Sequence, residues 1–238
     1  MGAVLTTRGI SVSFGGVRAL TEVDLDVGEG RLVGLIGPNG AGKTTFIDAI
    51  SGFVRSQGRV ELDGRDLTPF PPHARARRGL ARTWQSIELF DDLTVRENLT
   101  VVSGTSAAED ALASLGLEGL ADAVPSELSQ AQRKLVGLAR ALATEPRLLC
   151  LDEPAAGLDV TESQQLGRRL REMVDGGMAM LLVDHDMGLV LGISDHVVAL
   201  EFGKVIAEGP PEVVRGDPTV VTAYLGSAAA DVAGAGGA

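Results

Sequence analysis

A glycine-rich segment near the N-terminus carries residue types that bind phosphate groups. Residues 37–44 read Gly-Pro-Asn-Gly-Ala-Gly-Lys-Thr and match the pattern G-x-x-x-x-G-K-[ST], between an expected strand at 32–36 and an expected helix from Gly42 to about Ser51. Glycines let backbone N–H groups turn toward an anion, and the helix N-terminus adds a positive dipole end. We expect Lys43 to reach the β- and γ-phosphates of ATP and Thr44 to ligate Mg²⁺. The predicted nucleotide-binding residues of this segment are Gly37, Asn39, Gly40, Ala41, Gly42, Lys43, Thr44 and Thr45.

An apolar stretch that ends in two carboxylates supplies a second part of this predicted site. Residues 148–151 predict a buried strand, and Asp152 and Glu153 follow it directly. We expect this strand to lie beside the strand that precedes the glycine-rich loop, so that Asp152 reaches the Mg²⁺ shell and Glu153 polarises the attacking water. An isolated Asp-Glu pair at a strand end is more typical of a helix N-cap, but Pro-Ala-Ala-Gly-Leu-Asp follows here at 154–159.

Composition narrows the class of protein. The chain has 238 residues, 45% of them hydrophobic, and a formal net charge of −11, which opposes binding to nucleic acid. Its one cysteine, Cys150, gives no reason to expect an oxidising compartment, and neither a signal peptide nor a membrane-spanning stretch is predicted. We therefore expect an intracellular protein. We interpret two groups of arginines as solvated helix faces, namely Arg75, Arg77, Arg78 and Arg82, and Arg168, Arg169 and Arg171.

The order of expected elements predicts the fold class. Strand-like and helix-like segments alternate on both sides of a middle section with helical spacing, which favours an α/β fold with a parallel sheet covered on both faces. We predict one domain over residues 1–226, with a short helical subdomain inserted at about 86–129. The Ala/Gly-rich residues 227–238 are predicted to be disordered.

Up to about residue 226, the sequence resembles the nucleotide-binding subunits of ABC transporters. That resemblance implies a P-loop NTPase fold with a mixed or parallel sheet and an N-terminal antiparallel β subdomain. It also implies a role for further residues. Phe14 matches the aromatic that stacks on adenine, and Gln85 matches the glutamine that links the γ-phosphate and Mg²⁺ to the helical subdomain. Ser129 and Gln132 match the signature segment that contacts nucleotide. Asp159 matches the aspartate that communicates across a dimer, and His185 matches the switch histidine.

Within this family, four stretches are most similar to importer subunits for branched-chain amino acids and related amides. The resemblance implies a homodimer or heterodimer with a second ABC ATPase subunit, held on the inner face of the membrane by transmembrane permease subunits. A solute-binding protein would act indirectly. The stretches lie at 79–85, 93–99, 152–158 and 223–226.

The signature segment departs from the family pattern. The usual L-S-G-G-Q is Leu-Ser-Gln-Ala-Gln here, so Gln130 and Ala131 replace two glycines, and Leu135 stands where a basic residue is usual. A methyl group at Ala131 can crowd the ATP held by an opposite subunit. We therefore expect the composite site made by this signature to be weaker than the site made by this glycine-rich loop.

Two other classes of function stay open. One is a soluble P-loop ATPase or kinase, which the combination of Gln85, Ser129, Asp159 and His185 argues against. The other is a catalytically weak regulatory half of a heterodimer, favoured by the signature and disfavoured by Glu153. The leading hypothesis is an ATP-hydrolysing motor subunit.

Overall fold

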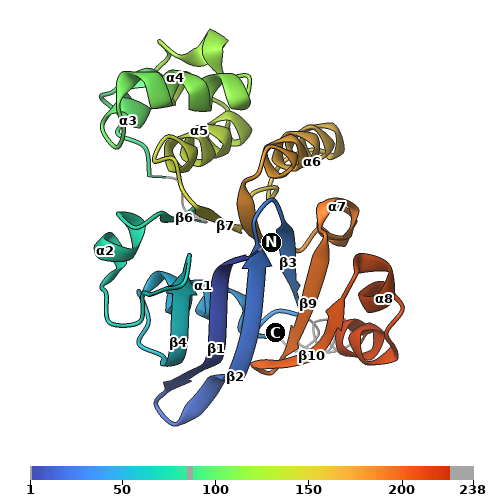
Figure 1. Cartoon of the computed structure of the whole chain (residues 1–238). Helices are drawn as coiled ribbons and strands as arrows, with labels where there is room; N and C mark the ends of the chain where they lie inside the picture. The colour runs from blue at the N-terminus through green and yellow to red at the C-terminus, as the bar shows by residue number, and fades with distance from the viewer. Residues whose placement is uncertain (1, 85–87, 226–238) are drawn as a thin grey trace, which may run out of the picture.

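The computed structural model describes residues 2–84 and 88–225, which form two β-sheets and a group of helices set apart from them (Figure 1). The smaller sheet is antiparallel where its strands pair, as predicted for the N-terminal region. Alternate residues of its two long strands are buried, because one face of the sheet covers the core. In spatial order its strands are β2 (Val17–Gly28), β1 (Ala3–Phe14), β4 (Gln57–Leu62) and β5 (Arg65–Asp66).

The larger sheet has six strands and is mixed. Five strands pair in parallel, and the last closes an antiparallel hairpin at one edge. Every residue of its three central strands is buried, which fits their continuous apolar sequences. The spatial order is β10 (Lys204–Gly209), β9 (His196–Glu201), β3 (Leu32–Ile36), β8 (Ala179–Val183), β7 (Leu148–Asp152) and β6 (Leu80–Arg82).

One expectation about this sheet was wrong. Strand β7, which carries Asp152, does not pair with β3, because β8 lies between them. Local sequence cannot reveal this order, since all three strands are equally apolar runs. The carboxyl ends of parallel strands nevertheless meet at one edge, so the two predicted halves of the site still face each other across the end of β8.

Helices cover both faces of the six-stranded sheet. Helix α1 packs between the two sheets, where Phe46, Ile47 and Ile50 are fully buried. Its bounds confirm the helix predicted from Gly42 to about Ser51. The opposite face packs against other helices, and residues 218–225 form a last helix. The helices around the sheets are α1 (Lys43–Ser51), α2 (Pro72–Ala76), α6 (Val160–Asp175), α7 (Met187–Ile193) and α8 (Pro211–Arg215).

The remaining helices form a separate group at the top of the view in Figure 1. They pack on one another through an apolar stripe that includes Leu99, Leu112 and Val136. The domain limits proposed from sequence stay a prediction, and residue 86, their expected start, lies outside the described residues. This group contains α3 (Val95–Thr100), α4 (Thr105–Ser114), α5 (Gln130–Leu142) and the 3₁₀ turns η1 (Glu118–Leu120) and η2 (Pro125–Glu127).

The first arginine group is not a solvated helix face throughout, which corrects the interpretation made from sequence. Arg75 is buried, and its guanidinium donates to four backbone oxygens, those of Ala49, Ile50, Phe70 and Thr68, at 2.7–3.0 Å. Ala49 and Ile50 lie in the last turn of α1, where carbonyl oxygens lack the donor four residues on that the helix interior supplies. Arg75 therefore fixes the C-terminal end of the helix whose N-terminus follows the glycine-rich loop.

We predict that Arg75→Met destabilises the protein by about 3 kcal/mol, because it leaves several buried carbonyls without a donor. Urea unfolding measures this free energy. Arg77→Ala is the matched control, since Arg77 is exposed on the same helix end and should change stability by less than about 0.5 kcal/mol. Equal losses in the two variants would contradict the assignment.

Candidate functional site

The glycine-rich loop has a backbone that only glycine can supply at two places. Gly37 has φ +150° and lies so close to the carbonyl oxygen of Leu200 that a Cβ would sit 2.2 Å from it. Gly42, the residue before α1, has φ +105°, and a Cβ there would sit 2.8 Å from Ala19 O. The loop is therefore packed against neighbouring strands, with the partly exposed N-terminal turn of α1 at its end.

Lys43 is the first residue of α1, at the end of this loop, and is half-buried. Its ammonium donates to the carbonyl oxygens of Gly37 at 2.6 Å and Pro38 at 3.0 Å. Burial lowers the pKa of Lys43, while the charges of Glu153 and Asp152 act in the opposite direction. The structure thus brings the predicted phosphate lysine and both predicted carboxylates into one electrostatic environment.

Asp152 ends β7 and is almost fully buried. Burial raises its pKa to about 6 despite the charge of Arg82, whose guanidinium nitrogen lies 3.7 Å from Oδ2. Its other oxygen, Oδ1, is buried and has no hydrogen-bond partner among the described residues. A buried carboxylate oxygen with a free lone pair beside a phosphate-binding loop is the kind of ligand that Mg²⁺ takes. Asp152 therefore fits the predicted metal role, and exposed Thr44 offers a hydroxyl from the start of α1.

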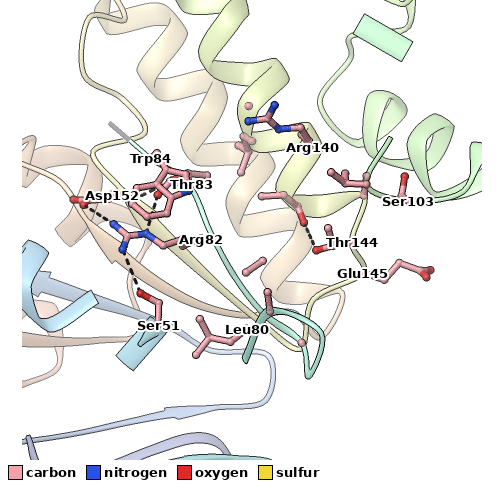
Figure 2. A pocket seen from close by; sticks show the side chains of 18 of the residues that line it. Ser51, Leu80, Arg82, Thr83, Trp84, Ser103, Arg140, Thr144, Glu145 and Asp152 are labelled. Atoms are coloured by element: carbon pink, nitrogen blue, oxygen red, sulfur yellow. Dashed lines mark hydrogen bonds and ion pairs between the residues drawn. The ribbon is translucent and has the colours of Figure 1, made fainter. Parts of the chain in front are cut away.

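Arg82 joins three elements at this point, a contact that sequence reasoning missed. Its side chain is 7% exposed, contacts Asp48 of α1 at 2.5 Å, and donates to Ser51 Oγ at 3.2 Å (Figure 2). The guanidinium also stacks on the ring of Trp84 at 3.9 Å. Trp84 therefore has a packing role. Arg82 was misread as solvated because nothing in the local sequence shows that β6 lies next to β7.

The loop after β7 holds Glu153 in an uncommon conformation. Its φ is +51°, in the left-handed region that a glutamate seldom adopts, and its N–H donates to Val183 O at 2.7 Å. Lys134 of α5 donates from Nζ to the carbonyl oxygens of Glu153 and Ala156. Strain of this kind collects at functional sites. The backbone is held from both sides, so the carboxylate of Glu153 is presented at the edge of the sheet.

The end of β8 places His185 between these two loops. Asp184, the residue before it, was not singled out from sequence, yet its side chain is fully buried. Its oxygens accept from the N–H groups of Ala155 and Asp186, both at 3.0 Å, and Oδ1 lies 3.4 Å from His185 Nδ1. The histidine side chain itself is 66% exposed. Asp184 therefore ties the loop after Glu153 to the segment that carries His185.

Two other predicted residues serve as helix caps. Ser129 Oγ accepts from Gln132 N at 3.2 Å, and Gln132 Oε1 accepts from Ser129 N at 2.8 Å, which is a capping box for α5. Asp159 caps α6 through a similar pair with Glu162. Ser129 and Asp159 therefore each have a local structural role, and their predicted contacts with a partner subunit stay predictions.

The last two residues predicted to belong to the site are Phe14 and Gln85. Phe14 ends β1, and its side chain is 52% exposed, so its ring can receive a flat ligand. Gln85 lies outside the described residues, although Trp84 shows where the chain leaves β6. The structure therefore brings together the glycine-rich loop, the two carboxylates and His185, and it leaves the role of Gln85 as a prediction.

A cavity of about 1020 Å³ lies between the six-stranded sheet and the helical group. Figure 2 shows it between β6 and α5, with Arg82 and Trp84 on one side and Arg140 on the other. Arg140 is half-buried, which lowers its pKa, and Glu88 is the carboxylate that acts on it. The cavity thus combines apolar walls with cationic side chains and reaches Asp152 at its inner end.

A glycine-rich loop between β3 and α1, with paired carboxylates at the end of a neighbouring parallel strand, defines a P-loop nucleoside triphosphatase. Comparison with known proteins narrows this class. The family profile described as ABC transporter matches residues 20–156. The chain belongs to the ATP-binding subunits of ABC transporters, which hydrolyse ATP.

Its relatives are similar over nearly their whole length. The high-affinity branched-chain amino acid transport ATP-binding protein BraF of Pseudomonas aeruginosa is 36% identical, covering 94% of this chain and 98% of its own. The probable branched-chain amino acid transport ATP-binding protein LivG of Archaeoglobus fulgidus is 37% identical, covering 94% and 96%. The crystal structure of the ADP conformation of an ATP-binding cassette superposes with a TM-score of 0.88 at 32% identity, over 95% of this chain and all of that one.

A second profile, described as branched-chain amino acid ATP-binding cassette transporter, matches residues 204–230. Across the described residues, no helix is long and apolar enough to cross a membrane.

We predict that Arg82→Met raises the Mg²⁺ concentration needed for half-maximal ATPase activity about tenfold, since Asp152 loses its nearest cation and holds its proton more tightly. Titrating Mg²⁺ at fixed ATP measures this shift. Arg82→Lys should recover part of it. Arg78→Ala, which removes an exposed arginine that stacks on Phe70, is the control and should leave the Mg²⁺ requirement unchanged. An unchanged requirement in Arg82→Met would refute the link.

Proposed function

We propose that this ATPase powers the import of branched-chain amino acids or related amides through separate permease subunits. The observation that carries the proposal is the match of residues 204–230 to the branched-chain amino acid cassette profile. It is supported by relatives named as branched-chain amino acid transport proteins, at 36–37% identity over nearly the whole chain. The cargo is chosen by other subunits, so the proposal concerns the transport system that this motor serves.

We assign the chemistry to residues at the edge of the six-stranded sheet. Backbone N–H groups of the second half of the loop, from Asn39 to Gly42, cradle the phosphates, with Lys43 leaving its carbonyl partners to contact them. Glu153 accepts a proton from the attacking water and orients it, and His185 donates to the γ-phosphate. Phe14 and Thr45 contact the rest of the nucleotide.

Mg²⁺, when bound, would neutralise charge that develops between the β- and γ-phosphates. Thr44, Asp152 and Gln85 are the proposed residues that hold it. The unpartnered Oδ1 of Asp152 supports this assignment, and Arg82 keeps the buried carboxylate charged.

Hydrolysis is proposed to need a second ATPase subunit. The first turn of α5, after Ser129, is partly exposed, and its N-terminal end can face ATP on an opposite subunit, with Gln132 and Asp159 near the same contact. A solved bacterial ABC transporter cassette with the same fold, 24% identical, is dimeric. Ala131 stands at the partly exposed position where crowding would weaken this contact.

The cavity between β6 and α5 is the proposed docking site for a permease. Its size fits a short helical segment, and its arginines favour a segment that carries acidic side chains. Asp152 and Arg82 line one end of the cavity, so a docked segment that moves would displace residues of the proposed metal site directly. A solute-binding protein would act through the permease and would not touch this chain.

We predict that Glu153→Gln protein forms an ATP-dependent dimer, because it binds MgATP without hydrolysing it. Multi-angle light scattering with and without MgATP measures the mass. The matched variant adds Gln130→Gly and Ala131→Gly and should dimerise at a lower protein concentration if the methyl group crowds the interface. Equal dimerisation of the two variants would remove the proposed asymmetry. A monomer in both would indicate an obligate heterodimer.

In cells, we expect Glu153→Gln to reduce uptake of radiolabelled leucine more than tenfold, because the motor no longer resets. The measurement compares initial uptake rates in the source organism with the wild-type and variant chain at equal expression. Uptake of a sugar serves as the control. Unchanged leucine uptake, with the purified variant inactive as an ATPase, would refute the cargo and leave the ATPase assignment intact.

A further inference from the structure

The C-terminal helix makes a contact with the nucleotide site that no predicted role covers. Residues 218–225 are helical, and the hydroxyl of Tyr224 accepts a hydrogen bond from the N–H of Gly37 at 2.8 Å. These residues are 187 positions apart in the sequence. Gly37 opens the glycine-rich loop, while Tyr224 lies in the segment that the branched-chain cassette profile matches. The contact therefore joins the end of the chain that this profile matches to the first residue of the glycine-rich loop.

This helix is anchored well enough to hold Tyr224 in place. Asp217 caps its start, since Oδ1 accepts from Thr219 N at 2.7 Å and Val220 N at 3.3 Å. Val220 is buried in the core formed on the outer face of the six-stranded sheet, and Ala223 is also buried. The tyrosine ring packs against the same core. The phenol oxygen is thus delivered from a fixed helix and not from a loose tail.

Gly37 is the point at which a small displacement would matter most. The residue is wedged against Leu200 O, so it cannot carry a side chain and is positioned by its backbone alone. Its N–H is held by Tyr224, and its carbonyl oxygen accepts from the ammonium of Lys43 at 2.6 Å. The phenol and the phosphate lysine are therefore attached to opposite sides of one glycine.

We propose that Tyr224 is a positioning residue for the nucleotide: it fixes the first turn of the phosphate loop through Gly37 and so raises the affinity for ADP and ATP. The C-terminal segment matched by the branched-chain cassette profile is thereby part of the nucleotide site. This inference does not depend on the transported solute, because it concerns nucleotide binding by the isolated chain. A tyrosine that only fills space would stabilise the fold without changing nucleotide affinity.

The test is calorimetric titration of purified protein with ADP in the presence of Mg²⁺, which needs no partner and no hydrolysis. Tyr224→Phe keeps the ring and its apolar packing but removes the acceptor of the Gly37 N–H. We expect the Kd for ADP to rise about fivefold, the size expected for one neutral hydrogen bond. Val221→Ala is the matched control on the exposed side of the same helix and should leave the Kd unchanged.

Hydrogen–deuterium exchange separates positioning from general loosening. In Tyr224→Phe, a peptide covering residues 36–44 should exchange faster, while peptides from β1 and α5 keep wild-type rates. Thermal unfolding without nucleotide reports any loss of stability separately. The proposal is overturned if the Kd for ADP in Tyr224→Phe stays within twofold of wild type, whether or not the unfolding temperature falls. It is also overturned if Val221→Ala weakens ADP binding as much.

Discussion

Parallel pairing of β3, β8 and β7 is the constraint on which the site depends. Parallel strands all end at the same edge of a sheet, so three loops distant in sequence must meet there. The first carries Lys43, the second His185 and the third Asp152 and Glu153. Because β8 lies in the middle, the histidine falls between the loop that holds phosphate and the loop that holds the carboxylates. No side-chain contact has to create this arrangement, although several maintain it.

Those maintaining contacts are mostly buried charges and polar groups. At Asp152, burial outweighs the nearby guanidinium, since the pKa rises to about 6 when a cation alone would lower it. The pKa of this carboxylate therefore lies closer to neutral pH than that of an exposed aspartate. Arg82 and Arg75 hold α1 from two sides, by its carboxylate Asp48 and by its terminal carbonyls. Removing one partner of a buried ion pair lowers the free energy of unfolding by more than the intact pair contributes, because the remaining charge is left buried and unpaired.

Sequence was sufficient for features that are local and was insufficient for those that depend on packing. The loop at 37–44 is contiguous and needs a particular backbone, so its residue types alone revealed it. The helix predicted from Gly42 to about Ser51 is likewise observed at Lys43–Ser51, directly after this loop. The roles of individual site residues remain predictions, since geometry alone does not test them.

The failures have a common physical cause. In the sequence, Arg75 and Arg82 resemble surface arginines, and only the packing of α1 and β7 against them shows that they are buried. Tyr224 is one residue of the importer-like stretch at 223–226, and only the folded helix shows its contact with Gly37. The order of β3, β8 and β7 is likewise a property of the assembled sheet, which near-identical apolar strands do not encode individually. Each missed feature pairs residues that are far apart in the chain.

One of these distant pairings gives the protein an optical label of its own. The chain has a single tryptophan, Trp84, whose indole contacts both the Arg82 guanidinium and the perpendicular ring of Phe53, at a wall of the large cavity. A stacked cation and a partly solvated ring both change indole emission when they move. The unlabelled protein therefore has one indole next to both Arg82 and the cavity. The wavelength and intensity of its fluorescence would report changes at either place.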